Sequence, residues 1–220
     1  MNNNQQVFGP VTVSCEDCMD LMARYPDKYF DLAIVDPPYG GGELADSKWT
    51  RNGGRLKKYG YDLPKWDYDP QPKYFKELFR ISKNQIIWGS NFFKLPTSRN
   101  FIVWYKPDIP EKMSFASCEL AWVSIQGNAK VYIHSAAHQL DRIHPTQKPV
   151  KLYKWILSRY AKKGDKILDT HLGSGSSAIA AYDMGFEFWG CEIIPEYYKC
   201  LTERIKNFAA QGVLNFEEAI

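Results

Sequence analysis

The sequence of 220 residues lacks the features that define several large classes of protein. It has no run near the ~18 consecutive apolar residues of a membrane span, and its N-terminus, MNNNQQVFGP, lacks the basic start and apolar core of a secretion signal. We therefore expect a cytoplasmic protein with no membrane partner. Internal repeats and low-complexity tracts are missing too, and the ordinary composition excludes disordered, collagen-like and repeat proteins.

Cysteine is scarce, with five residues scattered along the chain: Cys15, Cys18, Cys118, Cys191 and Cys200. Cys15 and Cys18 form a C-x-x-C pair, but no second pair and no nearby His completes a set of four zinc ligands. We therefore expect no metal site. A chain of this length buries roughly 70% of the surface that its unfolded form exposes, so residues 1–220 can fold as a single domain without a disulfide or a metal.

A strong excess of one charge is also missing. Lys and Arg number 28 against 25 Asp and Glu, which leaves a net charge of only +3. Any surface that binds nucleic acid must therefore be local. Aromatic residues, in contrast, are abundant, with 7 Trp, 14 Tyr and 12 Phe. Such rings either fill a core or stack on flat ligands, and core packing is the commoner use.

Short apolar runs alternate with amphipathic segments of helical length. Runs rich in Val, Ile and aromatic residues predict strands at 11–15, 31–36, 85–90, 101–106, 119–124, 130–134, 166–170 and 187–192. The amphipathic segments predict helices at about 17–25, 71–82, 149–163, 176–184 and 196–208. This alternation predicts an α/β fold with a mostly parallel sheet and helices on both faces. Residues 40–70 have no clean period, and so long a segment inside a compact domain is usually functional or mobile.

The tetrapeptide Asp36-Pro37-Pro38-Tyr39 directly follows the apolar run LAIV. Two prolines cannot continue a sheet, so the chain must leave it in a rigid extended turn at the carboxyl end of a strand, where open α/β sheets bind ligands. The Asp36 carboxylate and the Pro37 carbonyl are two acceptors, and Tyr39 is a flat ring. Together they suit a planar ligand with an exocyclic amino group. The alternative is a strand that prolines end and that Asp36 caps.

A second informative segment runs from Asp169 through Gly173-Ser174-Gly175 into a helix rich in small residues. The glycines permit a tight turn, and the helix N-terminus offers unpaired amides. Gly173-x-Gly175-x-x-Ala178 fits a dinucleotide fingerprint, with Glu192 ending the next strand to bind ribose hydroxyls. However, the turn comes too late in the chain for a second nucleotide-binding half. Asp169 would also repel a pyrophosphate and attract a cationic amino acid, so S-adenosylmethionine is favoured over NAD.

The two motifs in this order resemble the amino-methyltransferases that modify exocyclic nitrogens of DNA bases, in the permuted group whose catalytic motif precedes the cofactor motif. The resemblance rests on four segments that span most of the chain: Asp36-Pro37-Pro38-Tyr39, His144-Pro145-Thr146-Gln147-Lys148-Pro149, Asp169 with Gly173-Ser174-Gly175, and Gly190-Cys191-Glu192. It implies a Rossmann-like methyltransferase fold and S-adenosylmethionine as the cofactor. It also implies double-stranded DNA as the substrate, and family members are often homodimers or partners of a restriction endonuclease.

The resemblance also implies roles for single residues. Asp36 and the Pro37 carbonyl would hold the target amino group, and Tyr39 would stack on a base flipped out of the duplex. Asp17 and Cys18 would contact the cofactor's adenine, while Lys148 would frame its methionine end. The remaining cofactor contacts would come from Asp36, Asp169, Gly173, Ser174, Gly175 and Glu192. Asp at the first position of the tetrapeptide is more typical of adenine-N6 than of cytosine-N4 methylation, which stays the alternative.

The chain departs from the family pattern after Asp169, where Thr170-His171 replaces the usual Pro-Phe. This departure leaves open a catalytically weak protein that binds DNA or senses the cofactor. The expected DNA contacts lie in the basic and aromatic part of residues 40–70, because such segments suit phosphate binding and base replacement. They are Lys48, Arg51, Arg55, Lys57 and Lys58. Residues 107–143 form the second expected target-recognition insertion.

Overall fold

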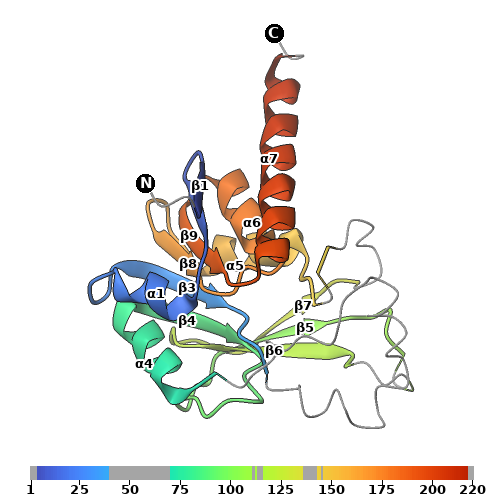
Figure 1. Ribbon diagram of the computed structural model, residues 1–220. Helices are drawn as coiled ribbons and strands as arrows, with labels where there is room; N and C mark the ends of the chain where they lie inside the picture. Colours follow the sequence, from blue (N-terminus) through green and yellow to red (C-terminus); the bar gives the residue numbers. More distant parts are fainter. Residues whose placement is uncertain are drawn as a thin grey trace.

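The computed structural model describes residues 4–39, 70–110, 112, 116–135, 143–144 and 146–217, with side chains up to residue 211. Within these ranges the strands form one nine-stranded sheet in the order β1-β2-β9-β8-β3-β4-β6-β5-β7 (Figure 1). The strands are β1 (Gln5–Phe8), β2 (Val11–Cys15), β3 (Phe30–Val35), β4 (Ser82–Trp88), β5 (Phe101–Tyr105), β6 (Cys118–Val123), β7 (Lys130–Ile133), β8 (Lys166–Asp169) and β9 (Glu187–Glu192). The helices are α1 (Cys18–Ala23), α4 (Pro72–Ile81), α5 (Val150–Tyr160), α6 (Ser176–Met184) and α7 (Pro195–Glu217).

The sheet is mixed but mostly parallel. Strands β2, β9, β8, β3 and β4 pair in parallel along its centre, and β7 is parallel to β5. Antiparallel pairing occurs at β1, which returns beside β2, and at β6, which lies between β4 and β5. The carboxyl ends of the five central strands therefore meet at one edge of the sheet.

Helices cover both faces because the buried strands carry apolar side chains on both sides. Leu32 and Ile34 of β3 pack into the core beneath α5, α6 and α7. Ala33 and Val35, the alternate residues of the same strand, pack into the core beneath α1 and α4. Figure 1 shows the same division, with α7 rising away from the sheet towards the C-terminus. None of the helices in the described part of the chain is long and apolar enough to span a membrane.

The predicted fold class is confirmed, and most element boundaries agree within one to three residues. Strand β1 was not predicted, because QQVF is short, polar and mostly exposed, so it carries no apolar pattern. Residues 107–143 are not wholly an insertion. Strands β6 and β7 lie inside this range, and backbone hydrogen bonds incorporate them into the sheet beside β4 and β5.

Candidate active site

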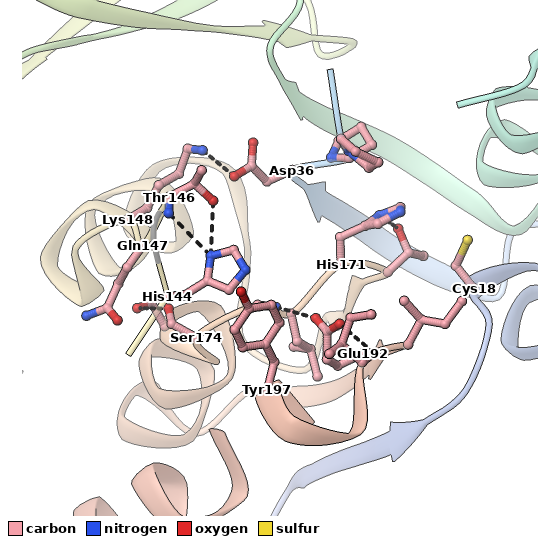
Figure 2. Close-up of a pocket in the computed structure, with 18 of the residues that line it drawn as sticks. Cys18, Asp36, His144, Thr146, Gln147, Lys148, His171, Ser174, Glu192 and Tyr197 are labelled. Carbon is pink, nitrogen blue, oxygen red and sulfur yellow. Dashed lines mark hydrogen bonds and ion pairs between the residues drawn. The ribbon is translucent and has the colours of Figure 1, made fainter. Parts of the chain in front are cut away.

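A cavity of about 530 Å³ opens at the carboxyl ends of β2, β3, β8 and β9. Its walls come from segments far apart in the sequence, as Figure 2 shows. Asp36, Pro37, Pro38 and Tyr39 line one end, Gly173, Ser174 and Glu192 line the other, and residues around His144 and Lys148 lie between them. The structure therefore brings the two predicted motifs into a single cavity.

Asp36 follows the last residue of β3 and directs its carboxylate at two donors. One oxygen accepts a hydrogen bond from the Tyr39 hydroxyl, and the other contacts the Lys148 ammonium. An ionised carboxylate has about four acceptor positions, so these two contacts orient it and leave capacity for another donor. The arrangement makes Asp36 a fixed hydrogen-bond acceptor at the cavity wall.

The Tyr39 ring is already stacked on one side. Its centroid lies 5.0 Å from that of Phe92, with 14° between the planes. Gly89 permits this packing, because a Cβ there would lie 2.1 Å from the Tyr39 ring and because its φ of +69° favours glycine. Tyr39 lines the cavity and Phe92 does not, so the stacked ring supports Tyr39 from outside the site.

Lys148 is the centre of a row of alternating charges. Its side chain is 3% exposed and contacts both Asp36 and Glu119, the latter at 3.2 Å. Glu119 in turn contacts Lys106, which follows β5. Burial opposes the charge on Lys148, but the two carboxylates outweigh it and raise the pKa of Lys148 above its ordinary value. Lys148 thus lines the cavity with its ammonium turned towards Asp36, and its expected place at the methionine end of a cofactor stays a prediction.

At the other end of the cavity, Glu192 fixes the glycine turn. Its two oxygens accept hydrogen bonds from the backbone N–H groups of Gly173 at 2.8 Å and Ile194 at 2.9 Å. Burial raises the pKa of Glu192, while these N–H groups act in the opposite direction. Gly190 allows the turn to pack on β9, since a Cβ there would lie 2.8 Å from the Asp169 carbonyl oxygen.

Asp169 and Gly175 do not line the cavity, in contrast to what the sequence led us to expect. The Asp169 carboxylate is turned inward, where it accepts hydrogen bonds from the Ser177 hydroxyl at 2.6 Å and the His171 N–H at 3.0 Å. Burial raises the pKa of Asp169 to about 7. Gly175, with φ +72°, lies against Leu201 and Ile205 of α7. Both residues therefore shape the turn and do not contribute to the cavity wall.

The α1 end of the cavity holds Asp17 and Cys18, and their contact with the adenine of a cofactor stays a prediction. Asp17 caps α1 by accepting a hydrogen bond from the Met19 N–H at 2.7 Å. Burial, aided by the negative charge of Asp17, raises the pKa of Cys18 to about 12, so its thiol is protonated at neutral pH. Neighbouring Glu16 also lines the cavity, but it pairs with Arg24.

One buried histidine, His144, and one half-buried histidine, His171, line the cavity, and the sequence had assigned a role to neither. His144 accepts a hydrogen bond at Nδ1 from the Thr146 N–H at 3.3 Å and lies edge-to-face against Tyr197. His171 lies edge-to-face against Tyr74, 5.3 Å between centroids. Burial lowers the pKa of each to about 4, helped at His144 by the charge of Lys148. Both are therefore neutral at pH 7, and His171 occupies the place of the family's usual Phe as an uncharged ring.

The charges of the cavity wall favour a cationic ligand. The carboxylates that line it number five, Glu16, Asp17, Asp36, Glu119 and Glu192, against one lysine, Lys148. Two of the five also contact a cation outside the wall, Glu16 with Arg24 and Glu119 with Lys106. A dinucleotide pyrophosphate would be repelled here, whereas a sulfonium and an ammonium group would be attracted. The residues present therefore fit the cofactor that the sequence favoured.

The predicted DNA contacts Lys48, Arg51, Arg55, Lys57 and Lys58 lie outside the described residues. Within the described ranges, no three His, Cys, Asp or Glu side chains are grouped as metal ligands would be. The five cysteines are all free.

A mostly parallel sheet with a glycine turn and an acidic Pro-Pro-Tyr segment at adjacent strand ends defines a Rossmann-like methyltransferase. Comparison with known proteins assigns the family. The model of the N6/N4 methyltransferase family, described as DNA methylase, matches residues 47–203, which is more than half of the chain. The protein therefore belongs to this family and is a DNA methyltransferase.

Individual relatives agree with this assignment. The Type II methyltransferase M2.DpnII of Streptococcus pneumoniae is 40% identical over 94% of this chain and 98% of its own length. The structure is similar to that of M1.HpyAVI in complex with SAM, with a TM-score of 0.55, 19% identity, and coverage of 89% of this chain and 98% of that one. It is also similar to the cytosine-N4-specific PvuII DNA methyltransferase, with a TM-score of 0.58, 13% identity, and coverage of 91% and 92%. The Rossmann-like fold predicted from the sequence is thus confirmed.

Proposed function

We propose that this DNA methyltransferase transfers a methyl group from S-adenosylmethionine to the N6 amino group of an adenine flipped out of double-stranded DNA. The observation that carries the proposal is the placement of the oriented Asp36 carboxylate in the same cavity as the Gly173 turn and Glu192. One end of the cavity suits an amino group and the other suits an adenosine, so a methyl group can pass between them.

The adenine amino group is a poor nucleophile because its lone pair is delocalised into the ring. Asp36 accepts one of its hydrogens and the Pro37 carbonyl accepts the other, which favours a pyramidal nitrogen with its lone pair free to attack. Since Lys148 and Tyr39 already orient Asp36, the acceptor needs little reorganisation when the base arrives. No strong base is required, because the nitrogen becomes acidic once it is methylated.

The base stacks on the Tyr39 ring, which lines the cavity and is supported by Phe92 from outside it. Extruding a base costs a few kcal/mol of stacking and pairing, which such contacts offset. Lys48, Arg51, Arg55, Lys57 and Lys58 supply phosphate contacts, and the parts of 107–143 outside β6 and β7 assist in target recognition.

S-adenosylmethionine supplies an activated methyl group on a sulfonium. Glu192 keeps acceptor capacity beside its two backbone donors and suits the ribose hydroxyls, while Asp17 and Cys18 suit the adenine. The uncharged Gly173-Ser174 turn and the acidic wall hold the methionine end. Asp169 and Gly175 contribute by fixing the turn.

The alternative is cytosine-N4 methylation, because an acceptor pair beside a stacking ring suits the exocyclic amino group of either base. Asp36 in the first position of the tetrapeptide favours adenine. To distinguish them, the protein is expressed in a host without DNA methylation and modified bases are mapped by single-molecule sequencing. N6-methyladenine at a fixed site is the expected result, and N4-methylcytosine would replace the proposal with the alternative. DNA without any modified base, from cells with abundant protein, would favour a binding protein.

A further inference from the structure

Glu119 is a cavity residue that the proposed reaction has not used. It belongs to β6, on the far side of β4 from the Asp36 segment, and its carboxylate lies between two lysines. One oxygen contacts Lys106, and the other is 3.2 Å from the Lys148 ammonium. Burial opposes ionisation of Glu119, but the two lysines outweigh it and lower its pKa, so the carboxylate is charged at neutral pH.

The four side chains Asp36, Lys148, Glu119 and Lys106 therefore form a row of alternating charges that runs from the end of β3 to the end of β5. Buried ion pairs contribute little to stability, because desolvation offsets their attraction and apolar residues of similar size serve as well. What such a row does provide is a fixed orientation for each of its side chains. Lys148 is fixed by carboxylates on two sides and by the Trp88 ring, whose centroid is 5.2 Å from its nitrogen.

We propose that Glu119 is a positioning residue for methyl transfer: it holds the Lys148 ammonium in the place from which Lys148 orients the Asp36 carboxylate towards the target amino group. The proposal rests on the proposed function, since it concerns the same acceptor. Without Glu119, Lys148 has Asp36 as its one carboxylate partner among the contacts described above. The Lys148 ammonium would then move closer to the Asp36 carboxylate. This contact would reduce the capacity of Asp36 to accept the hydrogens of the base.

The test is the isosteric substitution Glu119→Gln, which removes the charge and keeps the shape. The expected result is a fall of roughly 10- to 100-fold in the single-turnover rate of methyl transfer to DNA, because misplacement of a reacting group by about an ångström costs this much. The dissociation constants of S-adenosylmethionine and DNA, measured by calorimetry, should change by less than about threefold. Glu119→Asp keeps the charge and should recover part of the rate.

A matched control is available in the same chain. Glu77 on α4 is as exposed as Glu119, at 27%, and pairs with Arg80 at 2.8 Å, but it does not line the cavity. Glu77→Gln therefore breaks an ion pair of similar exposure, and its methyl transfer rate should equal that of the unmodified protein. A purely structural role of Glu119 would give the two variants the same rate.

A second measurement reports on the geometry without the reaction. The groups that face Lys148 and titrate or carry charge are Asp36 on β3's carboxyl end, Glu119 on β6, Tyr153 on α5, and His144 before α5. Of these, Glu119→Gln removes one negative charge, so Lys148 should lose its proton at lower pH. Lysine-ammonium NMR at neutral pH should show a shifted Nζ resonance and faster hydrogen exchange of the Lys148 ammonium in the variant, because this ammonium has lost one carboxylate partner.

A Glu119→Gln protein with the unmodified single-turnover rate would overturn the proposal. So would a slower variant that matches Glu77→Gln, or one whose Lys148 ammonium resonance and hydrogen exchange equal those of the unmodified protein. If Glu119→Gln fails to fold, Glu119→Asp is measured instead, and a methyl transfer rate and a Lys148 ammonium resonance equal to those of the unmodified protein would overturn the proposal. If the unmodified protein transfers no methyl group to DNA, the proposed function itself fails, and Glu119 has no reaction to serve.

Discussion

The two ends of the cavity hold their carboxylates in place by different kinds of contact. At the glycine end, two backbone N–H groups fix the Glu192 carboxylate, while a backbone N–H group and the Ser177 hydroxyl fix the Asp169 carboxylate outside the cavity wall. At the Asp36 end, the carboxylates are fixed by lysines from distant parts of the chain, with Asp36 and Lys148 separated by 112 positions. The first end is built by local backbone shape and the second by tertiary ion pairs.

This difference implies that the two ends can be disabled separately. The glycine end should govern affinity for the cofactor, because in the proposed function its acceptors bind the adenosine, which hardly changes during the reaction. The Asp36 end should govern the rate, because its acceptor is used most strongly when the amino nitrogen becomes pyramidal.

The largest effect is expected at the Asp36 end. Asp36→Ala removes the acceptor of the target amino group and should lower the single-turnover rate by ~10³-fold or more, as the loss of a fixed transition-state partner does elsewhere. Calorimetry should find the affinity for S-adenosylmethionine within about threefold of the unmodified protein. An equal loss of rate and cofactor affinity would mean that the two ends act as one.

At the glycine end we expect a smaller effect, which lowers the affinity for the cofactor and not the rate at saturating cofactor. Glu192 offers two oxygens to two backbone N–H groups, whereas Gln offers one oxygen and an NH₂ group that opposes the second N–H. Glu192→Gln should therefore weaken S-adenosylmethionine binding by roughly 10- to 100-fold, with the cost of an unsatisfied buried donor. At saturating cofactor the methyl transfer rate should recover to within a few-fold. A persistent low rate at saturation would contradict this assignment of Glu192 to binding.

The last prediction concerns the pH dependence of stability and not the rate or the cofactor affinity. Burial raises the pKa of Asp169 in the folded protein to about 7, from 3.8 when it is exposed. The folded state therefore holds this proton more tightly than the unfolded state. Its contribution to stability is complete below about pH 4 and is lost as the pH rises towards 7, by about 1.4 kcal/mol per pH unit.

The Asp169→Asn protein has no titratable group at this position. Its free energy of unfolding, relative to that of the unmodified protein, should therefore rise between about pH 5 and 7. Above about pH 7 the difference between the two proteins should stay constant. Urea denaturation of both proteins at several pH values measures this difference directly. Comparing the two proteins cancels the opposing contribution of His144 and His171, whose pKa values are lowered. A difference that is the same at pH 5 and 7.5 would place the Asp169 pKa outside this range.

The same contrast explains how much the sequence could predict. Apolar runs and turn residues identified the fold and all the central strands, since these depend on local patterns. The Asp36 tetrapeptide and the Gly173 turn were recognised for the same reason. The inward direction of Asp169 was missed because it depends on how the turn closes on Ser177. The pairing of Lys148 with Asp36 and Glu119 was missed because only the folded sheet brings β3, β6 and the start of α5 together.

The most direct test of the central claim is nucleoside mass spectrometry of DNA after incubation with the purified protein and isotope-labelled S-adenosylmethionine. The account predicts labelled N6-methyladenine with the unmodified protein and none above background with Asp36→Ala. Label on another nucleoside, or equal labelling by Asp36→Ala, would contradict the claim that Asp36 holds an adenine amino group for methyl transfer.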